Sequence, residues 1–134
     1  MLKNARRLVL LQGASVLRDY PIALGKNPKG PKRSHGDGRT PEGRYSLDWR
    51  IDDSKFHRAI HVSYPNERDL ELAHKAGLAA GDGVMIHGLP EGEHWIGEAH
   101  TEFYWSNGCI AVTDDEMDEI WELLDDGTPI EIRP

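Results

Sequence analysis

Alternation of apolar and polar residues recurs along this chain, and a period of two is typical of strands because successive side chains point to opposite faces. The first two strands are expected at 6–12 and 16–24, around a turn at Gly13-Ala14. Turn and alternation signals predict four more, at 44–49, 56–63, 84–86 and 128–132. The pattern therefore predicts a mostly-β fold.

Two segments instead show a helical period. One begins at Pro65-Asn66 and ends at Gly77, with Leu70, Ala73 and Ala76 expected on one side. The second follows Thr113, which with Glu116 has the spacing of a capping box. Its apolar stripe, which predicts core packing, consists of Met117, Ile120, Trp121 and Leu124.

The length of 134 residues fits one domain, 1–134, with a single core. Glycine and proline crowd into 25–43 and 77–97, which predicts two long loops that are functional or mobile. No apolar run reaches the length of a membrane helix, and the N-terminus lacks the apolar core of a signal peptide. A single cysteine excludes an internal disulfide and a cysteine-rich zinc site.

Charge is divided unevenly between the two halves. Residues 1–60 carry 13 Lys and Arg against 6 Asp and Glu, whereas residues 61–134 carry 3 against 17. The overall charge of −7 argues against a nucleic-acid partner. The basic residues of the first loop, Arg39 among them, could pair with ligand carboxylates or simply keep a loop soluble.

The only cysteine, Cys109, follows Gly108 and lies downstream of His87-Gly88. A thiol needs a base or nearby positive groups to become a nucleophilic thiolate. His87, the backbone N–H groups of 107–109 and the helix that begins after Val112 are all candidates for this role. We therefore expect a nucleophile rather than a buried apolar cysteine, and an oxyanion hole built from the N–H groups of Gly108 and Cys109.

Other polar residues near these motifs are ranked below the pair. Ser106 and Asn107 could orient the histidine or the substrate, or could simply form the turn. His61 ends a strand and could face the same site. A metal site at His87, His94 and His100 has no HExxH spacing and no completing carboxylate, so no metal or other cofactor is expected.

These motifs together resemble the L,D-transpeptidase catalytic domain (YkuD-type). The resemblance covers nearly the whole chain and rests on Ile86-His87-Gly88, Ser106-x-Gly108-Cys109-Ile110, Thr40-Pro41-Glu42-Gly43-Arg44-Tyr45, Gly127-Thr128-Pro129-Ile130 and the opening segments 8–11 and 20–25. It implies a mostly-β, sandwich- or barrel-like catalytic domain with two helices.

The resemblance also implies a reaction on bacterial peptidoglycan. Cys109 would attack the diaminopimelate carbonyl of a stem tetrapeptide, with His87 as base and Gly108 in the oxyanion hole, and would release D-alanine. An amine acceptor would give a 3→3 cross-link, whereas water would make the protein a hydrolase. Ser106, Asn107, Gly88, His61 and Arg39 are the expected substrate-binding residues.

Two departures from the family pattern keep alternatives open. Many members have His at the position of Asn107 and Arg at that of Ala111, and such an arginine would anchor a substrate carboxylate. The segments 108–112 and 60–66 look closer to a branch that includes peptidoglycan hydrolases. A catalytically silent wall-binding module is a third possibility. All of these predict a periplasmic or wall location, stem peptides as partners and a monomer.

Overall fold

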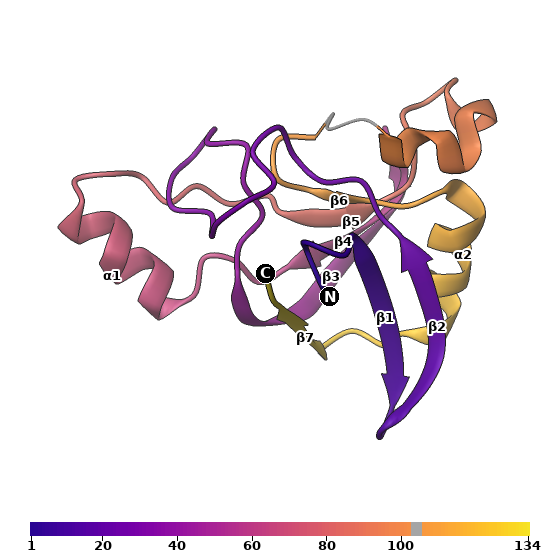
Figure 1. The fold of residues 1–134 in the computed structure, drawn as a ribbon, viewed down its shortest axis with the longest axis horizontal. Coiled ribbons are helices and arrows are strands. Elements are labelled where there is room, and N and C mark those ends of the chain that lie inside the picture. Colours follow the sequence, from indigo (N-terminus) through magenta and orange to yellow (C-terminus); the bar gives the residue numbers. More distant parts are fainter. Residues whose placement is uncertain (103–105) are drawn as a thin grey trace.

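The computed structural model describes residues 1–102 and 106–134, and its main element is a curled five-stranded sheet in the order β6-β5-β4-β3-β7 (Figure 1). Neighbouring strands are antiparallel except β5 and β6, which are parallel. A separate two-stranded sheet pairs β1 with β2. The elements are β1 (Arg7–Gln12), β2 (Ser15–Pro21), β3 (Gly43–Ser54), β4 (His57–Val62), α1 (Glu67–Lys75), β5 (Met85–His87), the 3-10 helix η1 (His94–Glu102), β6 (Ile110–Ala111), α2 (Asp114–Leu123) and β7 (Thr128–Ile132).

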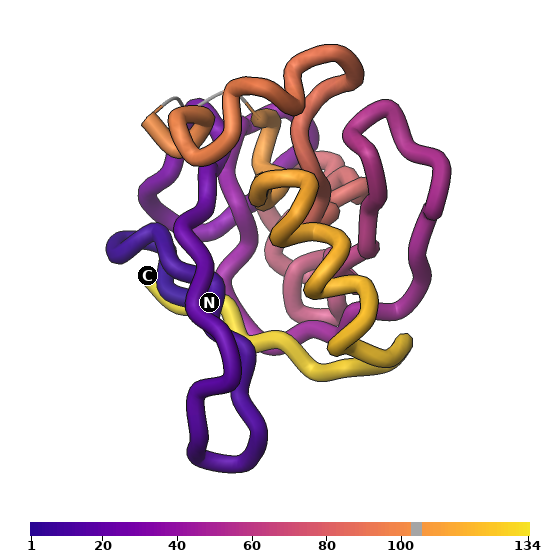
Figure 2. The backbone as a smooth tube through the Cα atoms, turned by 90° about the vertical axis from the view of Figure 1, so that its right-hand side faces the viewer, coloured from indigo at the N-terminus to yellow at the C-terminus, as the bar shows by residue number. Residues whose placement is uncertain are grey.

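The mostly-β fold class is confirmed, and the strands predicted from the alternating pattern are all present. The β1–β2 hairpin projects from the body of the molecule, as the tube in Figure 2 shows. Leu8, Leu10 and Tyr20 of this hairpin are buried, whereas Leu11 and Val16 near its tip are exposed. The hairpin therefore packs on the core only through the end nearest the main sheet.

One contiguous core lies between the main sheet, α2 and the hairpin. Apolar side chains of the central strands are fully enclosed there, which is the largest favourable contribution to folding. Its most deeply buried members are Ile22, Leu24, Ile60, Val62, Tyr64, Ile86, Ile110, Val112, Met117 and Ile120. The core holds β4, β5 and β6 together, and these strands carry the chemistry described below.

Helix α2 forms as its sequence predicts. Thr113 accepts a hydrogen bond from the Glu116 N–H, and the Glu116 carboxylate accepts one from the Thr113 N–H, which completes the capping box. Met117 and Ile120 are buried. The predicted core position of Trp121 is only partly right, because its ring lies at the edge of the core beneath the guanidinium groups of two arginines, Arg50 and Arg58.

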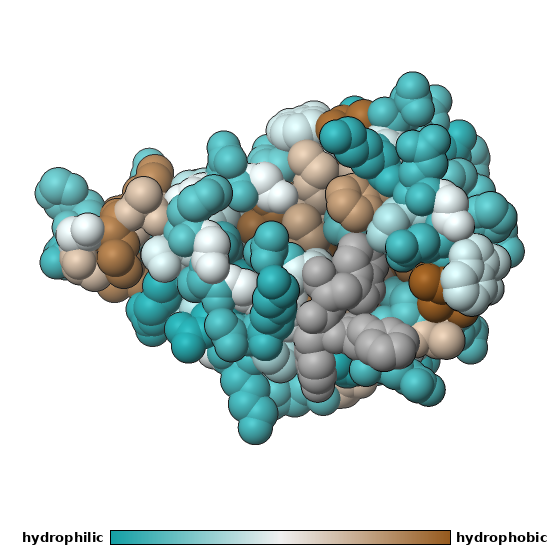
Figure 3. All heavy atoms as spheres, turned by 90° about the horizontal axis from the view of Figure 1, so that it is seen from above, coloured by the Kyte–Doolittle hydropathy of each residue, from teal (hydrophilic) through white to brown (hydrophobic). Residues whose placement is uncertain are grey.

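Helix α1 forms from Glu67 to Lys75, but its predicted apolar side is wrong. Ala73 is buried, whereas Leu70 is 53% exposed and Ala76 is exposed. Figure 3, viewed from above, shows apolar atoms gathered at the α1 end of the molecule. The helix contacts the core through one small residue, so its larger apolar side chains remain in water.

Three features were not predicted. The structure contains a third helix, η1, which is kinked at Gly97 and shows no 3.6-residue apolar period. Strand β3 continues past Trp49 to Ser54, where the sequence carries mainly exposed polar residues. Strand β6 has only two residues, too few for a periodic signal.

Candidate active site

The parallel pairing of β5 and β6 brings the segments that hold the two predicted catalytic residues side by side. Ile86 pairs with Ile110 and His87 with Ala111, which places Cys109 beside Met85. Neighbouring strands lie about 4.8 Å apart. The base and the nucleophile, distant in sequence, are therefore held one strand apart at the same end of the sheet.

The Cys109 thiol lies in a partly enclosed position just before β6. Its Sγ lies 3.5 Å from the carbonyl oxygen of Gly83, to which it donates. Burial raises the pKa of this thiol, while the N–H of Met85 and the ammonium of Lys32 act in the opposite direction. Desolvation outweighs the nearby positive groups and favours the neutral thiol in the free protein, so conversion to the thiolate stays a prediction.

The imidazole of His87 is buried, with 4% of the residue exposed. Its Nδ1 lies 2.7 Å from the carbonyl oxygen of Gly88. A carbonyl only accepts, so Nδ1 carries the proton and Nε2 is the basic nitrogen. The ring also packs against Phe56, with 4.4 Å between ring centroids.

Burial sets the charge of this imidazole as well. Desolvation lowers the pKa of His87 to about 4, and the charge of His100 acts in the same direction. The hydrogen bond to Gly88 opposes this shift without cancelling it. At neutral pH both groups therefore favour the neutral form in the free protein, and the imidazole carries its proton on Nδ1.

The turn before the thiol requires glycine at position 108. Gly108 has a φ of 110°, and a Cβ built there would lie 2.3 Å from the carbonyl oxygen of Arg39. The Thr40 hydroxyl donates to the Gly108 carbonyl at 2.8 Å and so also holds the turn. Close contact with the 25–40 loop therefore explains why a residue with a side chain would not fit here.

Ser106 serves the same turn. Its hydroxyl donates to the carbonyl of Cys109 at 2.7 Å and accepts from the Gly108 N–H at 3.3 Å. Of the two roles left open for this serine, the structure favours turn formation. The bond also engages the Gly108 N–H, so that an oxyanion hole using this group must first open a long hydrogen bond.

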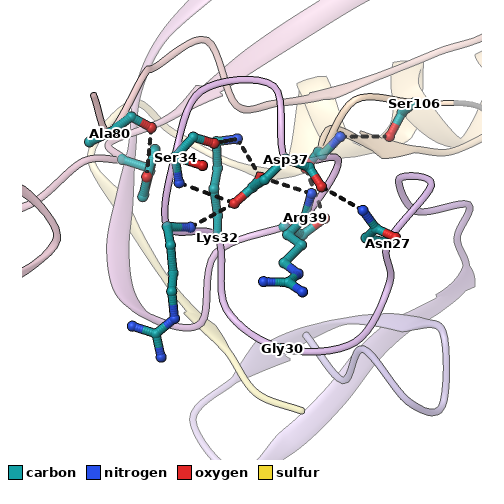
Figure 4. Close-up of polar contacts among 12 residues, drawn as sticks. Asn27, Gly30, Lys32, Ser34, Asp37, Arg39, Ala80 and Ser106 are labelled. Carbon is teal, nitrogen blue, oxygen red and sulfur yellow. Dashed lines mark hydrogen bonds and ion pairs between the residues drawn. The ribbon is translucent and has the colours of Figure 1, made fainter. Parts of the chain in front are cut away.

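The 25–40 loop, expected to be functional or mobile, is ordered around one carboxylate (Figure 4). Asp37 accepts hydrogen bonds from the ammonium of Lys32 and from the backbone N–H groups of Arg33, Ser34 and Arg39. Burial acts to raise the pKa of Asp37, but these four donors together hold it below its ordinary value. The anchored carboxylate fixes Lys32, whose charge acts on Cys109.

Arg39 reaches the site through its backbone rather than through its guanidinium. Its carbonyl oxygen packs against Gly108, whereas in Figure 4 its side chain extends away from Ser106. The Arg39 charge also acts on Lys3. Binding of a substrate carboxylate by Arg39 stays a prediction.

The other predicted substrate-binding residues take separate positions. Gly88 is buried, and a Cβ there would lie 2.6 Å from a carboxylate oxygen of Asp114, so close packing accounts for it. Asn107 is exposed at the tip of the turn. His61 lies on β4, where its Nδ1 is 2.6 Å from the Asp48 carboxylate.

Sequence reasoning missed the residues that surround the pair. Lys32 is one of the basic residues of the first loop but was not singled out, and neither were Asp37, Phe56 and Met85. Their roles depend on tertiary contacts that leave no periodic signal. Within residues 1–102 and 106–134, no three His, Cys, Asp or Glu side chains form a group that could hold a metal. None of the helices in this part of the chain is long and apolar enough to cross a bilayer.

Comparison with known families agrees with this geometry. The model of the L,D-transpeptidase catalytic domain, YkuD, matches residues 2–132. The chain belongs to this family. A curated relative, the Escherichia coli K12 protein YafK, is named as a candidate L,D-transpeptidase and is 31% identical over 111 residues.

Solved structures of other proteins share this fold. The helical cell shape determining protein Pgp2 from Campylobacter jejuni superposes with a TM-score of 0.72 and 22% identity, over 98% of this chain and 45% of its own. An L,D-transpeptidase from Mycobacterium smegmatis gives 0.65 and 18%, over 99% of this chain and 56% of its own. The alignment with YafK covers 81% of this chain but only 37% of that relative's length. The solved structures show a shared fold, and the family itself rests on the match over residues 2–132.

Proposed function

We propose that this protein catalyses cysteine-dependent acyl transfer on peptidoglycan stem peptides, as an L,D-transpeptidase with a thioester intermediate. The observation that carries the proposal is the β5–β6 pair, which holds Cys109 beside the strand that ends in a buried, oriented imidazole. Membership of the family supports the substrate class. The same substrate predicts a periplasmic or cell-wall location.

In the proposed reaction, His87 Nε2 takes the thiol proton as Cys109 Sγ bonds to the diaminopimelate carbonyl carbon. The tetrahedral intermediate then collapses, the bond to the D-alanine nitrogen breaks, and His87 returns the proton to that leaving amine. The Gly88 carbonyl stabilises the imidazolium that forms in between, because it accepts from Nδ1–H. A thioester on Cys109 remains.

A second stem peptide completes the proposed cycle. Its amine attacks the thioester carbonyl, forms a new amide and releases the thiol, which yields a 3→3 cross-link. Water in place of the amine would release a shortened stem peptide instead. Ala111 is fully buried at the position where many family members carry arginine, and it provides no carboxylate anchor, which keeps this hydrolytic outcome as the alternative.

Mass spectrometry of purified disaccharide-tetrapeptides incubated with the protein tests the proposal. We expect a cross-linked dimer that has lost one D-alanine, and no product with Cys109→Ala. Shortened monomers alone would establish the hydrolase. Unchanged substrate in both samples would contradict acyl transfer and favour a silent wall-binding module.

A further inference from the structure

A β-bulge on β3 places an aromatic side chain in line with the nucleophile. The pairing of β3 with β4 shifts between Leu47↔Val62 and Arg50↔Ile60, so Asp48 and Trp49 together oppose the single residue His61. A bulge of this kind re-aims side chains and is frequent next to active sites. Here it points both bulged residues at one imidazole.

Two contacts hold the resulting cluster together. The Trp49 indole stacks on the His61 ring with centroids 4.5 Å apart and an interplanar angle of 13°. The Asp48 carboxylate holds the same imidazole through Nδ1 at 2.6 Å. Trp49 nevertheless remains 44% exposed, so a large aromatic surface is fixed in place and open to solvent.

This cluster shares a row of the sheet with the thiol. His61 is paired directly with Met85 across β4 and β5, and residues paired in this way share a face. Met85 in turn lies beside Cys109. The row therefore runs Cys109, Met85, His61, Trp49 across four strands, or three strand spacings of about 4.8 Å, roughly 14 Å in all.

That span matches the proposed substrate. The attacked carbonyl belongs to the third residue of the stem, and the first residue is joined to the amino sugar through a lactyl linker. Three extended residues and the linker reach about 14 Å at roughly 3.5 Å per unit. A stem peptide laid across the strands from Cys109 would bring its sugar to the indole.

We infer that Trp49, supported by His61 and Asp48, is a saccharide-binding platform that recognises the amino sugar at the far end of the stem-peptide substrate. The inference rests on the proposed function, because it takes the stem peptide as the molecule that reaches from Cys109 to Trp49. The apolar C–H face of a pyranose ring packs on the open indole face, and the Asp48 carboxylate accepts hydrogen bonds from sugar hydroxyls. A pre-ordered ring loses little conformational entropy on binding.

Calorimetry on the inactive Cys109→Ala protein tests this platform. Two ligands are compared, the free tetrapeptide and the disaccharide-tetrapeptide. We expect the sugar-linked ligand to bind roughly three- to tenfold more tightly, the range that one aromatic contact supplies. Adding Trp49→Ala should remove that difference and leave binding of the free tetrapeptide unchanged.

Two variants accompany the measurement. Trp49→Leu, which keeps a bulky apolar side chain without an aromatic face, should lose the preference as well and guards against a simple loss of fold. Leu17→Ala on β2, where Leu17 is exposed to a similar extent (40%), should keep the preference. Equal affinity for both ligands, no binding of the sugar-linked one, or a preference that survives Trp49→Ala would overturn the inference.

Turnover measured separately keeps the two proposals distinguishable. If the wild-type protein leaves its substrates unchanged, the proposed function is wrong, whatever the binding data show. If turnover depends neither on the sugar nor on Trp49, the saccharide platform is wrong. Sugar-dependent binding without turnover would support the platform while contradicting acyl transfer.

Discussion

The Cys109 thiol is partly enclosed and the His87 imidazole is buried, yet burial shifts the pKa values of the two groups in opposite directions. Burial raises the pKa of Cys109, whereas it lowers that of His87. Both shifts favour the neutral form, because a low-dielectric environment disfavours whichever state is charged. In the free protein, burial therefore favours a neutral thiol and a neutral imidazole over a thiolate and an imidazolium.

The two sides also differ in what holds them. His87 belongs to β5 and is locked by its bond to Gly88 and its contact with Phe56. Cys109 follows a glycine turn that depends on packing against the 25–40 loop. The imidazole is thus positioned by the sheet, and the thiol is positioned by a loop that Asp37 organises.

Removing either reacting group should give the largest effect. We expect Cys109→Ala to lower the rate of stem-peptide conversion by roughly 10⁴-fold or more, and His87→Ala by about 10²- to 10⁴-fold. The residual activity of His87→Ala should rise with pH, because the thiol must then ionise unaided. A His87→Ala protein with unchanged rate would contradict the role of the imidazole as base.

The buried imidazole should also make stability depend on pH. Its pKa is about 4 when folded and about 6.5 when unfolded, so the unfolded chain binds more protons between these values. The His87 contribution is fully present above pH 6.5 and is lost as pH falls toward 4, by about 3 kcal/mol. Urea unfolding of the wild-type protein and of His87→Gln across this pH window measures the contribution as the difference between their free energies of unfolding. A difference that stays constant with pH would rule the contribution out.

The turn that holds the thiol should be intolerant of a side chain. Gly108→Ala places a Cβ against the Arg39 carbonyl, whereas a Cβ at Gly30, which also has positive φ, meets nothing within 4 Å. Backbone strain is common to both substitutions, so the contact should make Gly108→Ala less stable than Gly30→Ala by about 1–3 kcal/mol. Chemical denaturation of the two variants checks this, and equal losses would mean that strain alone matters.

The smallest expected effect concerns Lys32, which is 6% exposed and bonded to Asp37. Its ammonium lowers the pKa of Cys109, so Lys32→Met should raise that pKa and slow alkylation at fixed pH by roughly two- to fivefold. In wild type the alkylation rate should keep rising beyond the ordinary thiol pKa of 9.0. The exposed Lys29→Met is the matched control, and Lys32→Arg, which keeps the charge, should restore the rate.

Local signals in the sequence were sufficient for much of the fold. The Thr113–Glu116 capping box and the stripe beginning at Met117 predict α2, because both are patterns that lie within the sequence of one helix. Where tertiary packing decides, the same reasoning failed. Leu70 repeats at helical spacing but faces water, since only Ala73 of α1 meets the core.

The candidate site divides in the same way. The Gly-Cys and His-Gly motifs point to the pair itself, and their strands do lie together. The charge state of the pair could not be predicted, because burial of Cys109 depends on segments far away in sequence. Nor could alternation along β3 reveal the Trp49–His61 stack, since the bulge breaks the period where it matters.

The parallel pairing of Ile86 with Ile110 has a consequence for the order of folding. The β1–β2 hairpin closes through a two-residue turn, whereas the β5–β6 pair must bring together the ends of a long segment that includes η1. Closing a longer loop costs more entropy before any contact rewards it. Strand β5, which carries His87, and strand β6, which follows Cys109, should therefore meet late. The amide protons of Ile110 and Ala111 should be among the last to gain protection from exchange during refolding.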